Sequence, residues 1–206
     1  MQIYRGEGPI GLSPRLADKP GYIIWVRALS ESADDFPADG RHLIIARSVQ
    51  RNPVEALNPA WKTGNYLNNI VGLHEAEQRG ADDVVFLNRA GELTEASTSN
   101  VAFIDQCRVV TPPVSAGILP GITRSEVLQH VAARAGLEVE ERTIQPADLD
   151  QFQEAFLLST TKDIQPVAKI DAYQFTTGPT SHSFKLKKAF WEHASDYAEV
   201  HPKQKL

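Results

Sequence analysis

Short apolar runs separated by turn residues recur along this chain and predict strands. Apolar runs of four to eight residues between Gly, Pro, Asn or other polar residues are typical of buried strands. The runs of this kind are Tyr22 to Val26, Arg41 to Ala46, Asp83 to Leu87, Asn100 to Ile104, Arg108 to Thr111, Leu137 to Arg142, Ala155 to Ser159 and Val167 to Ile170. Residues 88–91 have the composition of a hairpin turn, and a second hairpin is expected between residues 100 and 111.

Three other segments show the spacing of helices. The first has apolar residues at helical spacing and a glycine placed to end it (Leu67, Ile70, Val71, Ala76 and Gly80). In the second, Thr123 to Glu126 has the pattern of a capping box, which predicts Thr123 as the N-cap. A last helix is expected from Ser181 to Val200, followed by a disordered tail over residues 201–206.

This mixture of strands, hairpins and helices predicts an α+β fold and not a doubly wound nucleotide-binding fold. Neither a Gly-x-Gly-x-x-Gly pattern nor a P-loop is present in the sequence. Residues 30–40 are polar, acidic and punctuated by Pro and Gly, which is typical of a linker between domains. We therefore expect three parts, namely residues 1–29, the linker 30–40 and a larger domain over residues 41–206.

The composition narrows the class of protein. The chain has 206 residues, of which 42% are hydrophobic, and a formal net charge of −5 with both signs interspersed. A nucleic-acid surface would show clustered Lys and Arg. The lone Cys107 fits a reducing compartment, and the sequence has no signal-peptide or membrane-span pattern. These features favour a soluble cytoplasmic protein, and the spacing of its histidines does not suggest a metal site.

Four short segments carry the candidate chemistry. They are Lys62 to Asn69, Leu93 to Asn100, Leu119 to Arg124 and Leu158 to Lys162. Taken alone, Lys62 would be a surface charge and Glu95 an exposed acid at a strand edge. The polar run after Glu95 (Ser97, Thr98, Ser99 and Asn100) is instead suited to fixing a buried carboxylate by hydrogen bonds. If Lys62 is buried beside Trp61, its amine becomes easier to deprotonate, as a Schiff base requires.

In their order and spacing these segments resemble the fold-type IV pyridoxal-phosphate enzymes, the class IV aminotransferases and their lyase relatives. This resemblance implies a D-amino-acid aminotransferase-like fold with pyridoxal 5'-phosphate as the cofactor. It also implies that Lys62 is catalytic and holds the cofactor aldehyde as a Schiff base. Tyr66 would bond the phenolic oxygen of the cofactor, and Glu95 would keep the pyridine nitrogen protonated.

The other motifs would hold the remaining parts of cofactor and substrate. By resemblance, Leu119 packs on the pyridine ring, and Ile122 and Thr123 bind the phosphate at a helix N-terminus. Thr160 would be a second phosphate ligand. Thr161 would meet the substrate carboxylate, although Ser159 to Thr161 alone would be an ordinary turn at a strand end.

The chain also departs from the family. Residues 1–29 resemble only the last strands of the small N-terminal domain, which in the family supplies an arginine for the phosphate. No residue here matches that arginine, so the sequence is expected to be a fragment, to begin at a start chosen too far downstream, or to be a shortened homologue with weakened cofactor binding. Three functions stay open: an aminotransferase acting on an amino acid and a 2-oxo acid, an aminodeoxychorismate lyase making p-aminobenzoate and pyruvate, and a catalytically silent homologue.

Two further expectations concern the subfamily and the assembly. The run Ala96 to Asn100 and the segment Ser159 to Val167 are closer to D-amino-acid aminotransferases than to branched-chain aminotransferases. The family builds its active site at a dimer interface, and the apolar strand Tyr22 to Val26 would lack neighbours in this chain. We therefore predict a homodimer.

Overall fold

The computed structural model describes residues 1–26 and 39–201. The chain divides into two compact units, Met1–Ser32 and Ala33–Leu206, each of which is considered by itself. Most of the expected linker 30–40 and of the expected disordered tail 201–206 lies outside the described residues. The division of the chain at residues 29 and 40 therefore stays a prediction.

The first unit is built on a two-stranded antiparallel sheet, in which β1 (Gln2–Tyr4) pairs with β2 (Gly21–Ile23). The turn between them is held by the Arg5 guanidinium, which donates to the Ser13 carbonyl at 2.8 Å and to two neighbouring carbonyls. The strand predicted over Tyr22 to Val26 was wrong in its extent. It begins at Gly21 and ends at Ile23 because β1 offers only three residues for pairing.

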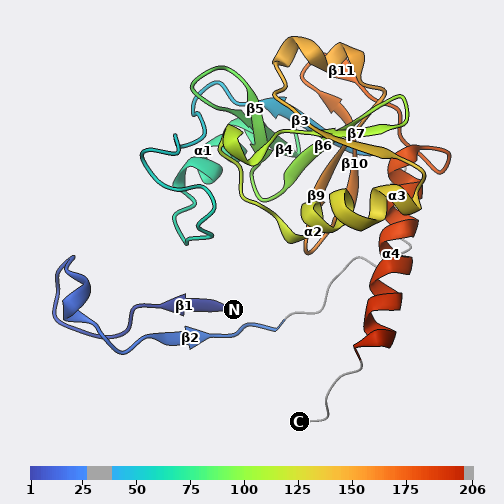
Figure 1. Cartoon of the computed structure of the whole chain (residues 1–206). Coiled ribbons are helices and arrows are strands. Elements are labelled where there is room, and N and C mark those ends of the chain that lie inside the picture. The colour runs from blue at the N-terminus through green and yellow to red at the C-terminus, as the bar shows by residue number, and fades with distance from the viewer. Residues whose placement is uncertain (27–38, 202–206) are drawn as a thin grey trace. The chain divides into compact units, whose positions relative to one another are not determined.

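The second unit is a mixed sheet that closes on itself. Its strands are β3 (Arg41–Ile45), β4 (Asp83–Leu87), β5 (Leu93–Ala96), β6 (Asn100–Asp105), β7 (Arg108–Thr111), β8 (Glu138–Glu141), β9 (Glu154–Ser159), β10 (Asp163–Ile170) and β11 (Tyr173–Gln174). Hydrogen bonds run along the order β10-β3-β4-β5-β6, and β9 pairs with both β6 and β10. This double pairing turns the sheet into a barrel with β7, β8 and β11 as extensions (Figure 1).

The middle of the central strand β6 is apolar at four successive positions, Val101 to Ile104, because both of its faces are buried. Successive residues of a strand point to opposite faces. In β6, Val101 and Phe103 belong to one hydrophobic cluster, whereas Ala102 and Ile104 belong to another. The first cluster also receives Ile144, Leu149 and Phe152 from the segment before β9, and the second receives side chains of the helices. The expected α+β fold is thus confirmed, with a core on each face of the sheet.

Helices cover the second unit on its outer faces. They are α1 (Leu67–Gln78), α2 (Ile122–Glu126), a π-helical turn (Val127–Val131), α3 (Ala132–Arg134) and α4 (His182–Val200). Ser181 is the N-cap of α4, and its hydroxyl accepts from the Phe184 N–H. Figure 1 shows α4 alongside α3, and the two are in contact. In the described residues, none of these helices has the length and apolarity to cross a membrane.

The expected apolar face of α1 is confirmed at Ala76 and wrong at its three larger residues. Leu67, Ile70 and Val71 are exposed, and the helix instead packs through the small residues Gly72 and Ala76. A Cβ at Gly72 would come within 2.4 Å of the Phe86 ring, so a larger side chain would separate α1 from β4. The buried face of α1 is therefore determined by the close approach of Gly72 to β4. A search for large apolar residues in the sequence does not reveal such a face.

The expected capping box at Thr123 is also wrong. The N-cap lies two residues earlier, at Gly121, so the helix begins at Ile122, and Thr123 is buried in its first turn without a capping hydrogen bond. Glu126 does not reach back to the helix start, because its carboxylate lies 2.9 Å from the Nε2 atom of His193 in α4. Glu126 therefore contacts α4 and does not take part in a capping box.

The Glu75 carboxylate fixes α1 to the segment after β3 and gives a prediction for stability. It accepts from the N–H and hydroxyl of Ser48 at 2.8 and 2.6 Å, from the Arg47 N–H and from the Arg79 guanidinium. Burial raises the pKa of this carboxyl, but the hydrogen bonds from Ser48, Arg47 and Arg79 outweigh it and lower the pKa from 4.5 to about 2.

We expect Glu75→Gln to lower the free energy of unfolding by about 1–2 kcal/mol at pH 7. The native pKa is depressed, so this contribution is complete above pH 4.5 and disappears as the pH falls toward 2. Urea unfolding of both proteins between pH 2 and 7 measures the difference. Glu77→Gln, at an exposed position of the same helix, is the control and should change little. If Glu75→Gln lowers the free energy of unfolding by the same amount at every pH in this range, the stabilising role of the ionised Glu75 carboxylate is contradicted.

Candidate active site

One pocket is lined by all of the site residues that the sequence predicted. It has a volume of about 650 Å³ and is lined by the segment 51–69, the β5–β6 turn, residues 119–123 and residues 158–161. The predicted site residues that line it are Lys62, Tyr66, Glu95, Leu119, Ile122, Thr123, Thr160 and Thr161. The strand pair Asn100 and Leu158 brings the β5–β6 turn next to residues 158–161, across β6 and β9. The structure therefore unites these residues, while the role of each stays a prediction.

Lys62 lies on an irregular segment before α1, four residues before Tyr66. Its Nζ atom donates to the Tyr66 hydroxyl at 3.3 Å. The expectation that Lys62 is buried beside Trp61 is wrong, because both side chains are exposed. Residues 46–66, which include Lys62, form neither strand nor helix. The lysine amine and the tyrosine hydroxyl form an accessible pair at the mouth.

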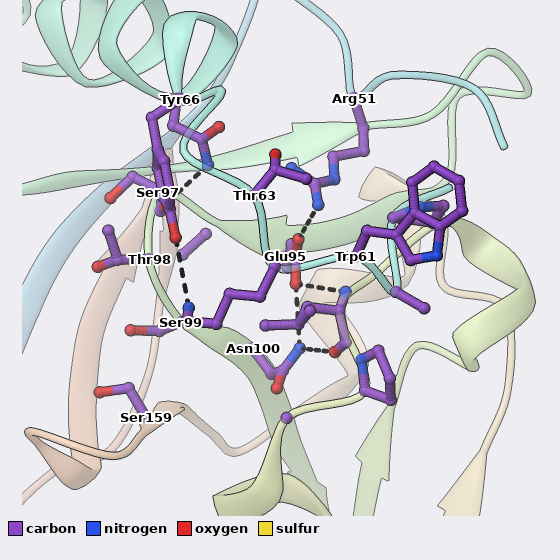
Figure 2. Close-up of a pocket in the computed structure, with 18 of the residues that line it drawn as sticks. Arg51, Trp61, Thr63, Tyr66, Glu95, Ser97, Thr98, Ser99, Asn100 and Ser159 are labelled. Carbon is purple, nitrogen blue, oxygen red and sulfur yellow. Dashed lines mark hydrogen bonds and ion pairs between the residues drawn. The ribbon is translucent and has the colours of Figure 1, made fainter. Parts of the chain in front are cut away.

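Glu95 has the opposite environment, since only 6% of its surface is exposed. One carboxylate oxygen, Oε1, lies 2.5 Å from Nη2 of Arg51. The other, Oε2, accepts from the side-chain amide of Asn100 at 3.1 Å and from the Leu119 N–H at 3.0 Å. Figure 2 shows Arg51 and Asn100 reaching Glu95 from different sides. A carboxylate has about four acceptor positions, so about one is left for a ligand.

Burial raises the pKa of the Glu95 carboxyl from 4.5 to about 7. The charges of Arg51 and Lys62 and the Leu119 N–H oppose this rise but do not cancel it. Strongly perturbed carboxyl groups in pockets are typical of functional sites, because burial without full compensation reduces stability. A ligand with a positive charge near Glu95 would supply the missing compensation.

The polar residues Ser97 to Asn100 were expected to hold the Glu95 carboxylate by hydrogen bonds, and this expectation is met in part. Of these four residues, Asn100 makes the expected hydrogen bond to the Glu95 carboxylate. The Ser99 hydroxyl is buried without a hydrogen-bond partner, and so is the hydroxyl of Ser159 on the facing strand. Both serines line the pocket, and Figure 2 shows them near each other on one side of it. Buried polar atoms without partners are rare in proteins, so these hydroxyls fit a polar ligand such as a phosphorylated pyridine.

The start of α2 lies at another side of the same pocket. Gly121 approaches Asn100 so closely that a Cβ would come within 2.2 Å of the Asn100 side-chain oxygen. Ile122 is exposed and Thr123 is buried, while Thr160 and Thr161 are exposed in the turn after β9. First-turn N–H groups of a helix lack intrahelical partners and favour anions. The donor set at this side suits a phosphate.

Arg51 is the important site residue that the sequence did not reveal. It lies 44 positions before Glu95, and no local motif marks it. Only the pairing of β4 with β5 brings the two side chains together, since the Arg51 N–H donates to the carbonyl of Leu87 at the end of β4. An arginine between an apolar strand and the lysine segment could have been noted as a possible partner for a buried acid. In the described residues, no cluster of three or more His, Cys, Asp or Glu side chains could hold a metal ion.

Comparison with known proteins identifies the family. A model of the family "Amino-transferase class IV" matches residues 1–170. The chain is 35% identical over 159 residues to a D-alanine aminotransferase of Listeria monocytogenes, covering 70% of this chain and 54% of that protein. It is 31% identical over 149 residues to a branched-chain-amino-acid aminotransferase of Pseudomonas aeruginosa, covering 71% of this chain and 47% of that protein.

A solved structure leads to the same result. The branched-chain amino acid aminotransferase of Thermobaculum terrenum, in its PLP-form, is 30% identical and superposes with a TM-score of 0.76 over 82% of this chain and 55% of that one. The chain thus spans about half the length of the relatives that it matches. The predicted fold-type IV class is confirmed, and both candidate subfamilies are represented among the relatives. This chain belongs to the class IV aminotransferase family.

Proposed function

We propose that this chain carries the cofactor-binding part of a pyridoxal-phosphate aminotransferase, which moves an amino group between an amino acid and a 2-oxo acid. The observation that carries the proposal is the shared pocket of an accessible amine, Lys62, and a buried carboxylate, Glu95. The Thermobaculum terrenum structure, which is of the PLP-form, supports the choice of cofactor. The aminotransferase names of the relatives support the choice of reaction.

Pyridoxal phosphate supplies a reactive carbonyl and a ring that takes up the electron pair released when an amino acid loses its α-proton. Lys62 would attach the carbonyl carbon through Nζ, and after substrate displaces it, would carry the proton away from the substrate α-carbon. Tyr66, 3.3 Å from Nζ, would donate to the phenolic oxygen and orient the ring. The accessible position of Lys62 suits both tasks, because the amine must move between attachment and proton transfer.

Glu95 would hold a proton on the ring nitrogen. Its buried carboxylate has about one acceptor position left, and a cationic N–H there would relieve the burial that raises its pKa. Leu119, half-buried next to this carboxylate, is proposed to pack on the ring face. The ring would then be fixed at its nitrogen and across its face.

The phosphate is proposed to lie at the start of α2. The N–H groups of Ile122 and Thr123 and the hydroxyls of Thr123 and Thr160 would donate to it. Thr161, next along the chain, would meet the substrate carboxylate. These N–H and hydroxyl donors would hold the phosphate at the start of α2.

A panel of D- and L-amino acids with 2-oxoglutarate tests the reaction and the stereochemistry. We expect amino-group transfer from one of the two series, with glutamate as the product. Pyruvate release from aminodeoxychorismate without an acceptor would support the lyase alternative, which no observation here favours. No reaction and no bound cofactor would support the silent homologue.

A homodimer is proposed on the exposed apolar residues of the first unit. Tyr22, Ile24, Trp25 and Val26 are exposed there, and an unpaired apolar edge tends to associate. We expect light scattering at micromolar concentration, with cofactor present, to give twice the mass of one chain. A mass of one chain would contradict this prediction. The cytoplasmic location proposed from the single Cys107 stays untested.

A further inference from the structure

Arg51 makes a close ion pair with the buried acid of the pocket. Its Nη2 atom lies 2.5 Å from Oε1 of Glu95, and 16% of its own side chain is exposed. Figure 2 shows the guanidinium above Glu95, on the opposite side from Asn100. An arginine so placed strongly affects the charge state of the acid, because electrostatic interactions are stronger where water is largely excluded.

The same guanidinium also holds the segment that follows β7. Its Nε atom donates to the Gly117 carbonyl at 3.1 Å, and Gly117 has the left-handed conformation with φ of 96°. The Arg51 backbone N–H donates to the Leu87 carbonyl at 2.9 Å. Arg51 is therefore tied to the end of β4 by its backbone and to two other segments by its side chain.

Asn100 makes a matching pair of contacts from the other side. Its side-chain amide donates to Oε2 of Glu95 at 3.1 Å and to the Leu119 carbonyl at 2.9 Å. The Leu119 N–H donates to the same carboxylate at 3.0 Å. Arg51 and Asn100 thus each link Glu95 to residues 117–119. The acid and this segment, which leads into α2, form one connected unit.

We propose that Arg51 is a positioning residue that favours the ionised form of Glu95 and locks it to residues 117–119, so that one acceptor position stays directed to the cofactor ring nitrogen. This inference rests on the proposed function. A neutral Glu95 carboxyl would present a hydroxyl or a weak acceptor to the ring nitrogen. A carboxylate in another orientation would lose the hydrogen bond from the Leu119 N–H. Arg51 opposes both changes through the charge and the fork of a single guanidinium.

The first test uses the protein without cofactor. Infrared titration of the Glu95 carboxyl, assigned by its absence in Glu95→Gln, should show in Arg51→Gln a pKa above the value near 7 of the unchanged protein. Arg51→Lys keeps the charge but not the fork, and should leave the pKa close to that value. The charged groups that act on Glu95 are Arg51 and Lys62, so Lys62 stays unchanged in these variants.

The second test measures the dissociation constant of pyridoxal phosphate by fluorescence. We expect Arg51→Gln to weaken binding by about 10- to 100-fold, and Arg51→Lys by less, because a charged hydrogen-bonded contact contributes in this range. Arg108→Gln is the matched control, since Arg108 forms only surface ion pairs with Glu138 and Glu140. It should change neither quantity.

The two measurements separate the possible failures. An unchanged Glu95 pKa in a folded Arg51→Gln protein contradicts the inference, as does a raised pKa with unchanged cofactor affinity. If Arg51→Gln does not fold, equal cofactor affinities of Arg51→Lys and the unchanged protein contradict the locking role. Failure of the unchanged protein to bind cofactor contradicts the proposed function, and the titration then still decides whether Arg51 favours the ionised form of Glu95.

Discussion

Changing Lys62 to alanine is expected to lower the rate of amino-group transfer by at least about 10³-fold, because the variant loses both the attachment point and the proton carrier. General acid–base catalysis alone contributes about 10²- to 10⁴-fold. The fold should be kept, since Lys62 is exposed and its amine donates a hydrogen bond to the nearby Tyr66 hydroxyl. Steady-state rates with the best donor of the amino-acid panel measure the effect, and circular dichroism checks the fold.

Lys185→Ala is the matched control for this experiment. Lys185 is exposed on α4 and is not among the residues that line the pocket. We expect its activity to equal that of the unchanged protein. Comparable activity of the Lys62→Ala variant would assign the chemistry to another residue, and equal losses in both variants would point to general instability.

Changing Glu95 to glutamine is expected to lower the rate by about 10²-fold or more, because an uncharged amide does not keep a proton on the ring nitrogen. The amide fills the same space, and its oxygen can still accept from Asn100 or Leu119. Stopped-flow measurement of a single half-reaction separates this loss from product release. A half-reaction rate within threefold of the unchanged protein would contradict the role of Glu95.

The same variant should change how stability depends on pH in the cofactor-free protein. Burial raises the native pKa of Glu95 to about 7 from 4.5, so the folded state binds the proton more tightly than the unfolded state. The stability contributed by the protonated acid is complete below pH 4.5 and is lost as the pH rises through 7. The loss is on the order of 3 kcal/mol at one pKa unit per 1.36 kcal/mol.

The variant Glu95→Gln lacks this titration. The difference in unfolding free energy between the variant and the unchanged protein should therefore shift in favour of the variant between pH 4.5 and 8. In the variant, Arg51 loses its charged partner at every pH, which changes the unfolding free energy by a constant amount. The titration of Glu95 is therefore read from how the difference in unfolding free energy changes with pH. Urea unfolding at several pH values measures it. A difference that is independent of pH would mean that Glu95 titrates near its ordinary value.

Strands buried on both faces were the easiest part of the fold to predict from the sequence. β4, β6 and β7 lie where the apolar runs indicated, because burial on both faces leaves no polar alternation. The closure of the barrel was not predictable, since the pairing of β9 with both β6 and β10 leaves no local pattern. The start of α2 was misplaced because Glu126 contacts His193 in α4, a contact far away in the sequence.

The candidate site shows the same division between local motif and distant contact. Lys62 and Glu95 each lie in a short motif, and both line the predicted pocket. Arg51 escaped notice because its contact with Glu95 depends on strand pairing. The expected burial of Lys62 failed because sequence neighbours such as Trp61 do not determine what covers a side chain.

The most direct test of the account is borohydride reduction of the protein mixed with pyridoxal phosphate, followed by peptide mass spectrometry. Reduction makes the link between an amine and the cofactor permanent. The account predicts a phosphopyridoxyl group on Lys62 in nearly every chain at a cofactor concentration just above that of the protein, and none in Lys62→Ala. Labelling spread over exposed lysines such as Lys185, or labelling that persists in Lys62→Ala, would contradict it.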